Sequence, residues 1–189
     1  MVKIIEKTKK LFEQTIKDFE SDPYKLQNHV FEVEKWAHFM LKKYPKAKSK
    51  IVLLAVWLHD IGHYPIPTDK DHAIRGEQRA KVFLKKENLS KDEIKKVLHC
   101  VRSHRCNDIL PISIEAKIIA FADSAAHLTD DLYFDIARKD KENKKPFKVY
   151  LKMERDLRDL SLFPNEKKKI LELSANWKKL LKSYEKINI

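Results

Sequence analysis

The stretch IVLLAVWLHDIGHYP, residues 51–65, joins the most apolar run of the chain to a cluster of polar residues. Its first half is uniformly apolar, which predicts a helix that is buried on all sides. A helix that only needs to end can do so at a glycine, and Gly62 stands where a left-handed residue commonly closes a helix. The polar side chains on either side of this glycine therefore require a separate explanation; they are His59, Asp60 and His63.

The composition predicts a helical protein. Only two of the 189 residues are glycine, Gly62 and Gly76, whereas 43% are hydrophobic. Few glycines together with abundant Leu, Ile, Lys and Glu favour helices over the turn-rich sandwiches and barrels. A chain of this length can bury one well-filled core. We therefore expect an all-α fold, a single compact multi-helix domain over residues 1–189.

Capping residues and prolines predict where the helices begin. Ser-Asp-Pro at 21–23 provides an N-cap and a first-turn proline, and Ser49, Asp71 and Ser113 are expected to cap later helices. Ser-Lys-Asp-Glu at 90–93 has the pattern of a capping box. The expected helices cover about residues 3–20, 23–43, 49–61, 72–87, 91–105 and 114–131, and two more follow Pro146 and Pro164.

The sequence argues against two classes of partner, membranes and nucleic acids. The longest apolar run, residues 51–58, is far shorter than the roughly 20 residues of a membrane-spanning helix, and the charged N-terminus does not resemble a signal peptide. We therefore expect a cytoplasmic protein. The formal net charge of +12 would attract phosphate-bearing partners. No nucleic-acid-binding motif accompanies the lysine-rich runs, so we expect these runs to be solvated surface.

Several polar residues occupy the apolar faces of their expected helices. His29, His104 and Asp123 each continue the apolar line of a helix, and His59 and Asp60 directly follow the buried run. Any one of them alone would be read as a hydrogen-bonded core group. Their convergence from different helices instead indicates a shared site. Imidazole nitrogen mixed with carboxylate oxygen suits manganese, iron, cobalt, nickel or zinc better than magnesium.

The order of these residues resembles the HD superfamily of metal-dependent phosphohydrolases. The resemblance is carried by His29, by the His59–Asp60 doublet in LHDIGH and by Asp123 in FADSAAH, and it covers about residues 23–135. It implies an all-helical HD-like core with a metal site in its interior. A C-terminal helical extension of about 146–189 would follow this core.

The resemblance also implies which residues hold the metal. By position, the ligands of a first divalent ion would be His29, His59, Asp60 and Asp123. His72 and His104 would hold a second ion, with Asp60 bridging the two. Gly76, one turn after His72, supports the second site, because a mid-helix glycine costs about 1 kcal/mol relative to alanine and something must occupy the space. The alternative explanation for Gly76 is close helix packing.

Departures from subfamily motifs narrow the expected substrate. The chain lacks the Gly-Tyr-Pro signature of the cyclic-dinucleotide phosphodiesterases and has Ser103 in place of their additional histidine. It has no Glu-Asp pair of the kind that follows the doublet in the alarmone hydrolases. HDIGHYP with a later Gly-Glu at 76–77 is similar to the deoxynucleotide triphosphohydrolases, which are much longer proteins. We therefore expect a small phosphorylated substrate, and a nucleotide in particular.

The resemblance implies hydrolysis of a phosphate ester or anhydride bond by a metal-activated water, because a bound divalent ion lowers the pKa of water. Asp60 would orient or deprotonate this water, and His63 or His127 would act on the leaving oxygen. The alternative for both histidines is a hydrogen bond to a metal ligand. Three arginines near His72 and His104 in the chain are candidates for binding phosphate oxygens, with ordinary surface residues as the alternative. Arg75 and Arg79 follow His72 at spacings of three and seven, and Arg105 follows His104.

Two other functions fit the same residues. Some members of the superfamily with six such ligands hold two irons and activate oxygen, so a di-iron HD-type oxygenase is the first alternative. A basic binding protein with a residual metal site is the second, and it would use the excess of lysine and arginine. No oligomeric state is implied by the sequence.

Overall fold

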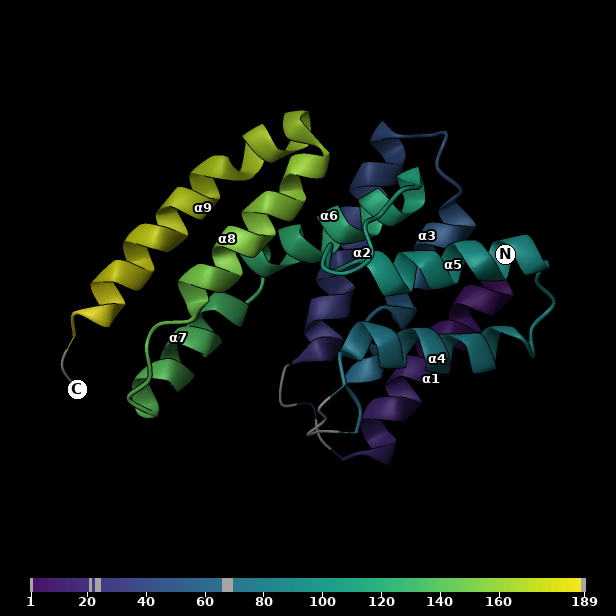
Figure 1. Cartoon of the computed structure of the whole chain (residues 1–189), viewed down its shortest axis with the longest axis horizontal. Helices are drawn as coiled ribbons and strands as arrows, with labels where there is room; N and C mark the ends of the chain where they lie inside the picture. The colour runs from purple at the N-terminus through teal and green to yellow at the C-terminus, as the bar shows by residue number, and fades with distance from the viewer. Residues whose placement is uncertain (1, 21, 23–24, 66–69, 188–189) are drawn as a thin grey trace. The chain divides into compact units, whose positions relative to one another are not determined.

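The computed structural model describes residues 2–20, 22, 25–65 and 70–187, and every regular element among them is a helix (Figure 1). The elements in chain order are α1 (Val2–Asp18), α2 (Leu26–Lys43), α3 (Ser49–Leu58), the short 3-10 helix η1 (Ile61–His63), α4 (His72–Leu84), α5 (Lys91–Ser103), α6 (Ile114–Thr129), α7 (Leu132–Glu142), α8 (Val149–Asp159), η2 (Leu160–Leu162) and α9 (Pro164–Glu185). The predicted all-α class is confirmed. No helix within these described ranges is long and apolar enough to cross a membrane.

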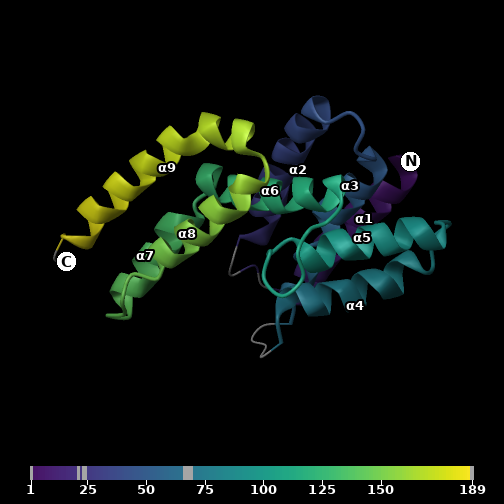
Figure 2. The same cartoon turned by 45° about the horizontal axis from the view of Figure 1, so that its top comes forward.

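The helices form two compact units, an N-terminal unit Met1–Asp123 and a C-terminal unit Ser124–Ile189. In the N-terminal unit, α1, α2 and α5 pack against α3, and α4 packs against α5 and η1. α4 and α5 lie side by side in both views (Figure 1 and Figure 2). In the C-terminal unit, α7, α8 and α9 pack against one another. The single domain over residues 1–189, with an HD-like core of about 23–135 and an extension of about 146–189, stays a prediction.

Helix α3 is the buried centre of the N-terminal unit, as its apolar sequence predicts. Every residue from Ile51 to Leu58 is buried. The ring of Trp57 packs edge-on against Phe12 of α1 and against Phe31 of α2. Because α3 is surrounded by other helices, the His59–Asp60 doublet at its C-terminal end begins inside the protein.

Side-chain caps fix the first residues of α4 and α5. An Asp71 carboxylate oxygen accepts a hydrogen bond from the backbone N–H of Ala73, 2.8 Å away, so α4 begins at the next residue after this cap. Ser90 and Glu93 form the reciprocal capping box that the sequence predicts. Both predicted caps are therefore confirmed, and each caps a helix that carries a candidate metal ligand.

The start of α2 is held by Asp22. Its two carboxylate oxygens accept hydrogen bonds from the backbone N–H groups of Leu26 and Gln27, at 2.7 and 3.1 Å. The carboxylate therefore satisfies N–H groups that have no acceptor within the helix. Ser21 and Pro23, the other members of the expected cap, lie outside the described residues.

Among the helix boundaries that differ from those predicted, two involve short polar side chains. Ser49 is the first residue of α3 rather than its cap, and Lys48 occupies the cap position without a side-chain hydrogen bond. The helix expected to run to residue 131 ends at Thr129. There the Asp130 carboxylate accepts a hydrogen bond from the Leu132 backbone N–H, and α7 begins. Short polar side chains compete in this way with helical hydrogen bonds.

The two glycines lie against one another and serve helix packing. No glycine among the described residues has a positive φ, so the expected left-handed helix end at Gly62 is wrong. A Cβ atom on Gly62 would stand 1.9 Å from the carbonyl oxygen of His72 and 2.4 Å from the amide nitrogen of Gly76. A Cβ atom on Gly76 would stand 3.1 Å from the carbonyl oxygen of His59. Glycine therefore allows η1 to approach the first turn of α4.

We expect Gly62→Ala to lower the free energy of unfolding by about 3 kcal/mol or more, because overpacking typically costs about 1–3 kcal/mol and this contact is with backbone. Gly76→Ala is the matched control, since its closest contact is 3.1 Å. We expect Gly76→Ala to cost less than about 1 kcal/mol, because alanine also favours the helix. Urea unfolding followed by circular dichroism measures both variants. Equal stabilities would contradict the packing described for Gly62.

Candidate metal centre

The N-terminal unit brings together the six side chains that the HD resemblance nominates as metal ligands. They come from five places in the fold: α2, the residues after α3, the start of α4, the end of α5, and α6. Four are buried and two are partly exposed. In chain order they are His29, His59, Asp60, His72, His104 and Asp123.

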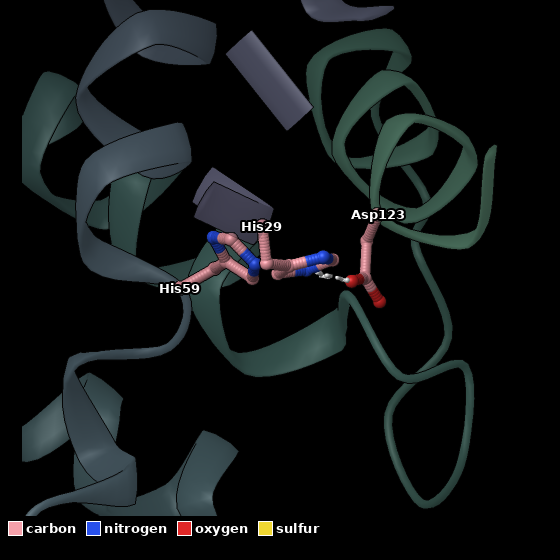
Figure 3. Close-up of side chains that lie close together, drawn as sticks. All are labelled: His29, His59 and Asp123. Carbon is pink, nitrogen blue, oxygen red and sulfur yellow. Dashed lines mark hydrogen bonds and ion pairs between the residues drawn. The ribbon is translucent and has the colours of Figure 1, made fainter. Parts of the chain in front are cut away.

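The first cluster consists of His29, His59, Asp60 and Asp123. Figure 3 shows the side chains of His29, His59 and Asp123 pointing toward one another, and their candidate ligand atoms all lie within 4.8 Å. Nε2 of His29 is 3.0 Å from Oδ1 of Asp123 and 3.8 Å from Oδ2 of Asp60. Nε2 of His59 is 3.4 Å from the same Asp60 oxygen. Ligands each about 2 Å from one ion lie roughly 3–4 Å apart, so these separations fit a single ion.

The second cluster lies around the other oxygen of Asp60. Oδ1 of Asp60 is 3.6 Å from Nε2 of His63, 3.4 Å from Nε2 of His72 and 3.7 Å from Nε2 of His104. The Nε2 atoms of His72 and His104 are 3.1 Å apart. One carboxylate therefore faces both clusters. This arrangement is the one that the predicted bridging role requires, and that role stays a prediction.

His63 lies beside the second cluster, whereas the sequence nominated it as a proton donor or as a hydrogen-bond partner of a metal ligand. It lies in η1, three residues after Asp60, and its ring stacks on that of His72 with centroids 3.9 Å apart. A 3-10 turn brings residues i and i+3 to the same side. This spacing of three residues was the available sequence signal.

Hydrogen bonds at Nδ1 fix the orientation of two imidazoles. Nδ1 of His59 donates to the carbonyl oxygen of Val56, and Nδ1 of His104 donates to that of Val101, each at 2.7 Å. A carbonyl can only accept, so Nδ1 carries a proton in both rings and Nε2 is the nitrogen that can bind a metal ion.

The Nε2 atom of His59 is buried without a hydrogen-bond partner among the described residues. An unsatisfied buried polar atom costs about 1–3 kcal/mol. A metal ion held by His59, His29, Asp60 and Asp123 would satisfy it. The residues present therefore fit a divalent ion, by their chemistry as well as by their spacing.

The protonation states suit metal binding. Burial lowers the pKa of His72 to about 2 and that of His104 to about 4, because a buried imidazolium loses its hydration. Burial acts to raise the pKa of Asp60. The nearby imidazoles, His59 and His63 first, lower this pKa by more than burial raises it, so it lies well below its ordinary value. Neutral imidazole and ionised carboxylate are the forms that bind metal ions.

Two of the three candidate phosphate-binding arginines hold the backbone next to His63. Nη1 of Arg79 donates to the carbonyl oxygens of Ile61 and Tyr64, at 2.9 and 3.0 Å. Arg75 also donates to the carbonyl oxygen of Tyr64. These contacts fasten the segment that carries His63 to α4. The expected contact of Arg75 and Arg79 with substrate stays a prediction.

Arg105 lies at the edge of the second cluster. It follows His104 in the chain and forms an ion pair with Asp71, the residue before His72. The pKa of His72 is lowered mainly by burial, and the positive charge of Arg105 makes a smaller contribution in the same direction. The guanidinium therefore lies near that ring. Its predicted role in phosphate binding is not tested by these contacts.

His127, the other predicted proton donor, lies in a polar network of the C-terminal unit. Nζ of Lys152 is 2.7 Å from Nδ1 of His127 and 2.6 Å from Oδ2 of Asp156, and the Tyr133 hydroxyl donates to the same Asp156 oxygen at 2.8 Å. An ammonium group can only donate, so Nδ1 of His127 accepts in this hydrogen bond, and Nδ1 also lies 3.3 Å from Oδ2 of Asp156. The catalytic role of His127 stays a prediction.

Comparison with known proteins agrees with this arrangement of residues. The HD domain family model matches residues 26–127, which is more than half of the chain and includes all six nominated ligands. The chain therefore belongs to the HD domain family, whose members are generally metal-dependent phosphohydrolases. No curated protein and no solved structure was found to match it. The resemblance to the HD superfamily is thereby confirmed.

Proposed function

We propose that the protein is a metal-dependent phosphohydrolase that cleaves a phosphate ester or anhydride bond of a small phosphorylated substrate, and that this substrate is a nucleotide. The carboxylate of Asp60 carries the proposal: one oxygen lies 3.4 Å from His59 in the first cluster and the other 3.4 Å from His72 in the second. A carboxylate in this position can hold two divalent ions, with manganese, iron, cobalt, nickel and zinc as the candidates.

The residues of the two clusters would have different roles in hydrolysis. When bound, divalent ions supply Lewis-acid polarisation of a phosphoryl oxygen and lower the pKa of a bound water. Asp60 is ionised and lies between the clusters, so it can orient a water or accept its proton. The side chain of His63 is 24% exposed and that of Asp60 is 6% exposed, so His63 is the one that a leaving group can reach. His127 is the alternative donor.

We propose Arg105 for the substrate phosphate, because its charge lies near enough to His72 to add to the effect of burial in lowering the pKa of that ring. Arg105 pairs with Asp71, whereas Arg75 and Arg79 donate to backbone carbonyl oxygens, which are not among the candidate ligand atoms of the clusters. We expect Arg105→Gln to raise KM about tenfold with little change in kcat, since a hydrogen bond to a charged group contributes about 1.5–3 kcal/mol.

Steady-state kinetics of Arg105→Gln and Arg79→Gln separate binding from positioning. Loss of the Arg79 contacts to the backbone near His63 is expected to lower kcat instead, because the ring would be less well placed. The opposite pattern, with KM raised only in Arg79→Gln, would assign phosphate binding to Arg79.

A phosphate-release screen over nucleoside mono-, di- and triphosphates, with several divalent metals, tests the proposed function. Release with manganese or cobalt supports it. Oxygen consumption by an iron-loaded sample that releases no phosphate would instead indicate the di-iron oxygenase. Retention on nucleic acid at moderate salt, without turnover of any substrate, would indicate the basic binding protein.

A further inference from the structure

A cavity of about 310 Å³ opens on the α4–α5 pair of the N-terminal unit. Its walls come from α4, α5 and the segment that follows α5. Small-molecule sites commonly have volumes of about 300–1,000 Å³, so the cavity has room for a small ligand. None of its lining residues belongs to the metal clusters or to the candidate phosphate-binding arginines.

Helix α5 presents different faces to the cavity and to the metal centre. Val97 is fully buried seven residues before His104, on the face that carries this imidazole. Lys95, Leu98 and Arg102 follow one another at spacings of three and four residues, and these three line the cavity. The cavity is therefore a separate place on the helix and not an entrance to the clusters.

One part of the cavity is apolar. Ile94 and Leu98 of α5 line it together with Ile109 of the following segment. This segment is fastened to α5, because the backbone N–H of Ile112 donates to Nε2 of His99 at 3.2 Å. Burial lowers the pKa of His99, so the ring is neutral and carries its proton on Nδ1. The cavity thus has an apolar wall and an imidazole N–H donor among its lining residues.

The other part of the cavity is positively charged. Arg102 is balanced by an ion pair with Asp108 and by Glu77, whose carboxylate is 3.7 Å away. Lys91 and Lys95, one helical turn apart, also line the cavity, and no carboxylate pairs with either of them among the described residues. Asp92, whose pKa is lowered first by Lys96 and also by Lys95, forms its direct ion pair with Lys96 instead. Two positive charges therefore stand beside an apolar wall without a direct ion pair in the described part of the chain.

We propose that this cavity binds an organic anion, whose apolar body lies against Ile94, Leu98 and Ile109 and whose carboxylate or phosphate pairs with Lys91 and Lys95. An apolar surface with a few convergent polar groups is the usual composition of a ligand site. Lys91, Lys95 and Arg102 together exceed Glu77 and Asp108 by one positive charge, so the surroundings of the cavity still attract such an anion. This site is independent of the proposed hydrolase activity.

Fluorescence titration with anilinonaphthalene sulfonate, an apolar aromatic anion, tests the site in the full chain. We expect the double variant Lys91→Glu, Lys95→Glu to raise Kd at least about tenfold, since a tenfold change corresponds to about 1.4 kcal/mol. The matched control is Lys81→Glu, Lys85→Glu, which reverses two exposed charges with the same spacing, one in α4 and one directly after it. We expect this control to change Kd less than twofold. Equal weakening in both double variants would overturn the proposal.

Two further measurements locate the ligand and its chemistry. Binding should shift the backbone amide resonances of Ile94, Leu98 and His99, and Ile109→Ser should weaken it without a change in charge. Shifts confined to other helices would overturn the proposal.

Competition experiments then identify the chemical class of the anion. Displacement by decanoate supports a fatty carboxylate, and displacement by phenyl phosphate supports an aromatic phosphate. Displacement by neither would overturn the assigned ligand class.

Discussion

Asp60→Asn is expected to reduce phosphate release by at least about a hundredfold, the scale found when a main catalytic group is removed. Both carboxylate oxygens can bind a metal ion, because Oδ2 is 3.4 Å from Nε2 of His59 and Oδ1 is 3.4 Å from Nε2 of His72. Asparagine keeps the shape of the side chain but removes its charge and one acceptor oxygen. The variant therefore loses its affinity for metal in both clusters and its ability to take a proton from water.

Thermal melting of the same variant measures metal binding apart from catalysis. Manganese should raise the Tm of the wild type, because an ion that binds only the folded state stabilises it by about 2.7 kcal/mol at a hundred times its Kd. The Asp60→Asn apoprotein should melt below the wild-type apoprotein, because the neighbouring imidazoles favour the ionised carboxylate in the folded state, and it should also gain much less from manganese. Glu6→Gln, which alters an exposed carboxylate on α1, is the control. Near-normal turnover, or a full metal-induced shift, would mean that the doublet is structural.

The fold was largely predictable because its signals are local. A run of apolar residues with no polar face predicts that α3 is surrounded, and all of Ile51–Leu58 are buried. Ser90 with Glu93, and Asp71 before α4, predict helix starts through hydrogen bonds within a few residues. The start of α7 was missed, because the hydrogen bond from the Leu132 N–H to a side chain competes with helical hydrogen bonds that are equally local.

The reason for the two glycines was not predictable, because it depends on contacts between distant segments. A glycine after a helix is ordinarily explained by a positive φ. Gly62 instead leaves room for the backbone of His72 and Gly76, ten or more residues away along the chain. Only the packing of η1 on α4 shows that contact. It also supports the close-packing alternative for Gly76.

The candidate metal ligands could be predicted from the sequence, but the hydrogen-bond partners of nearby residues such as Arg79 could not. Helical spacing placed His29 and Asp123 on buried faces, and their side chains are 3.0 Å apart. Nothing in the spacing of Arg79 predicts that its guanidinium would bind carbonyl oxygens rather than face solvent or substrate. Loop carbonyls become acceptors only after the chain has folded, so these contacts have no local sequence signal.

His72→Ala is the variant expected to remove metal from the second cluster alone. Nε2 of His72 is 3.4 Å from Oδ1 of Asp60 and 3.1 Å from Nε2 of His104. The first cluster retains His29, His59 and Asp123, whose ligand atoms lie together within 4.8 Å. The side chain of His72 is 18% exposed, so truncation should disturb packing less than the loss of a fully buried imidazole.

The wild type should bind about two manganese ions per chain, and His72→Ala about one. The reason is that His72 would be a ligand of the second ion only, so its removal leaves the first ion in place. Phosphate release should fall about a hundredfold, since the remaining ion cannot stabilise both the attacking and the leaving oxygen. His38→Ala, at an exposed position on α2, should keep both ions and normal turnover. Plasma emission spectrometry and a phosphate-release assay measure the two quantities on the same samples. One ion in the wild type, or two in His72→Ala, would remove the second metal from the mechanism and leave Asp60 as a ligand of a single ion.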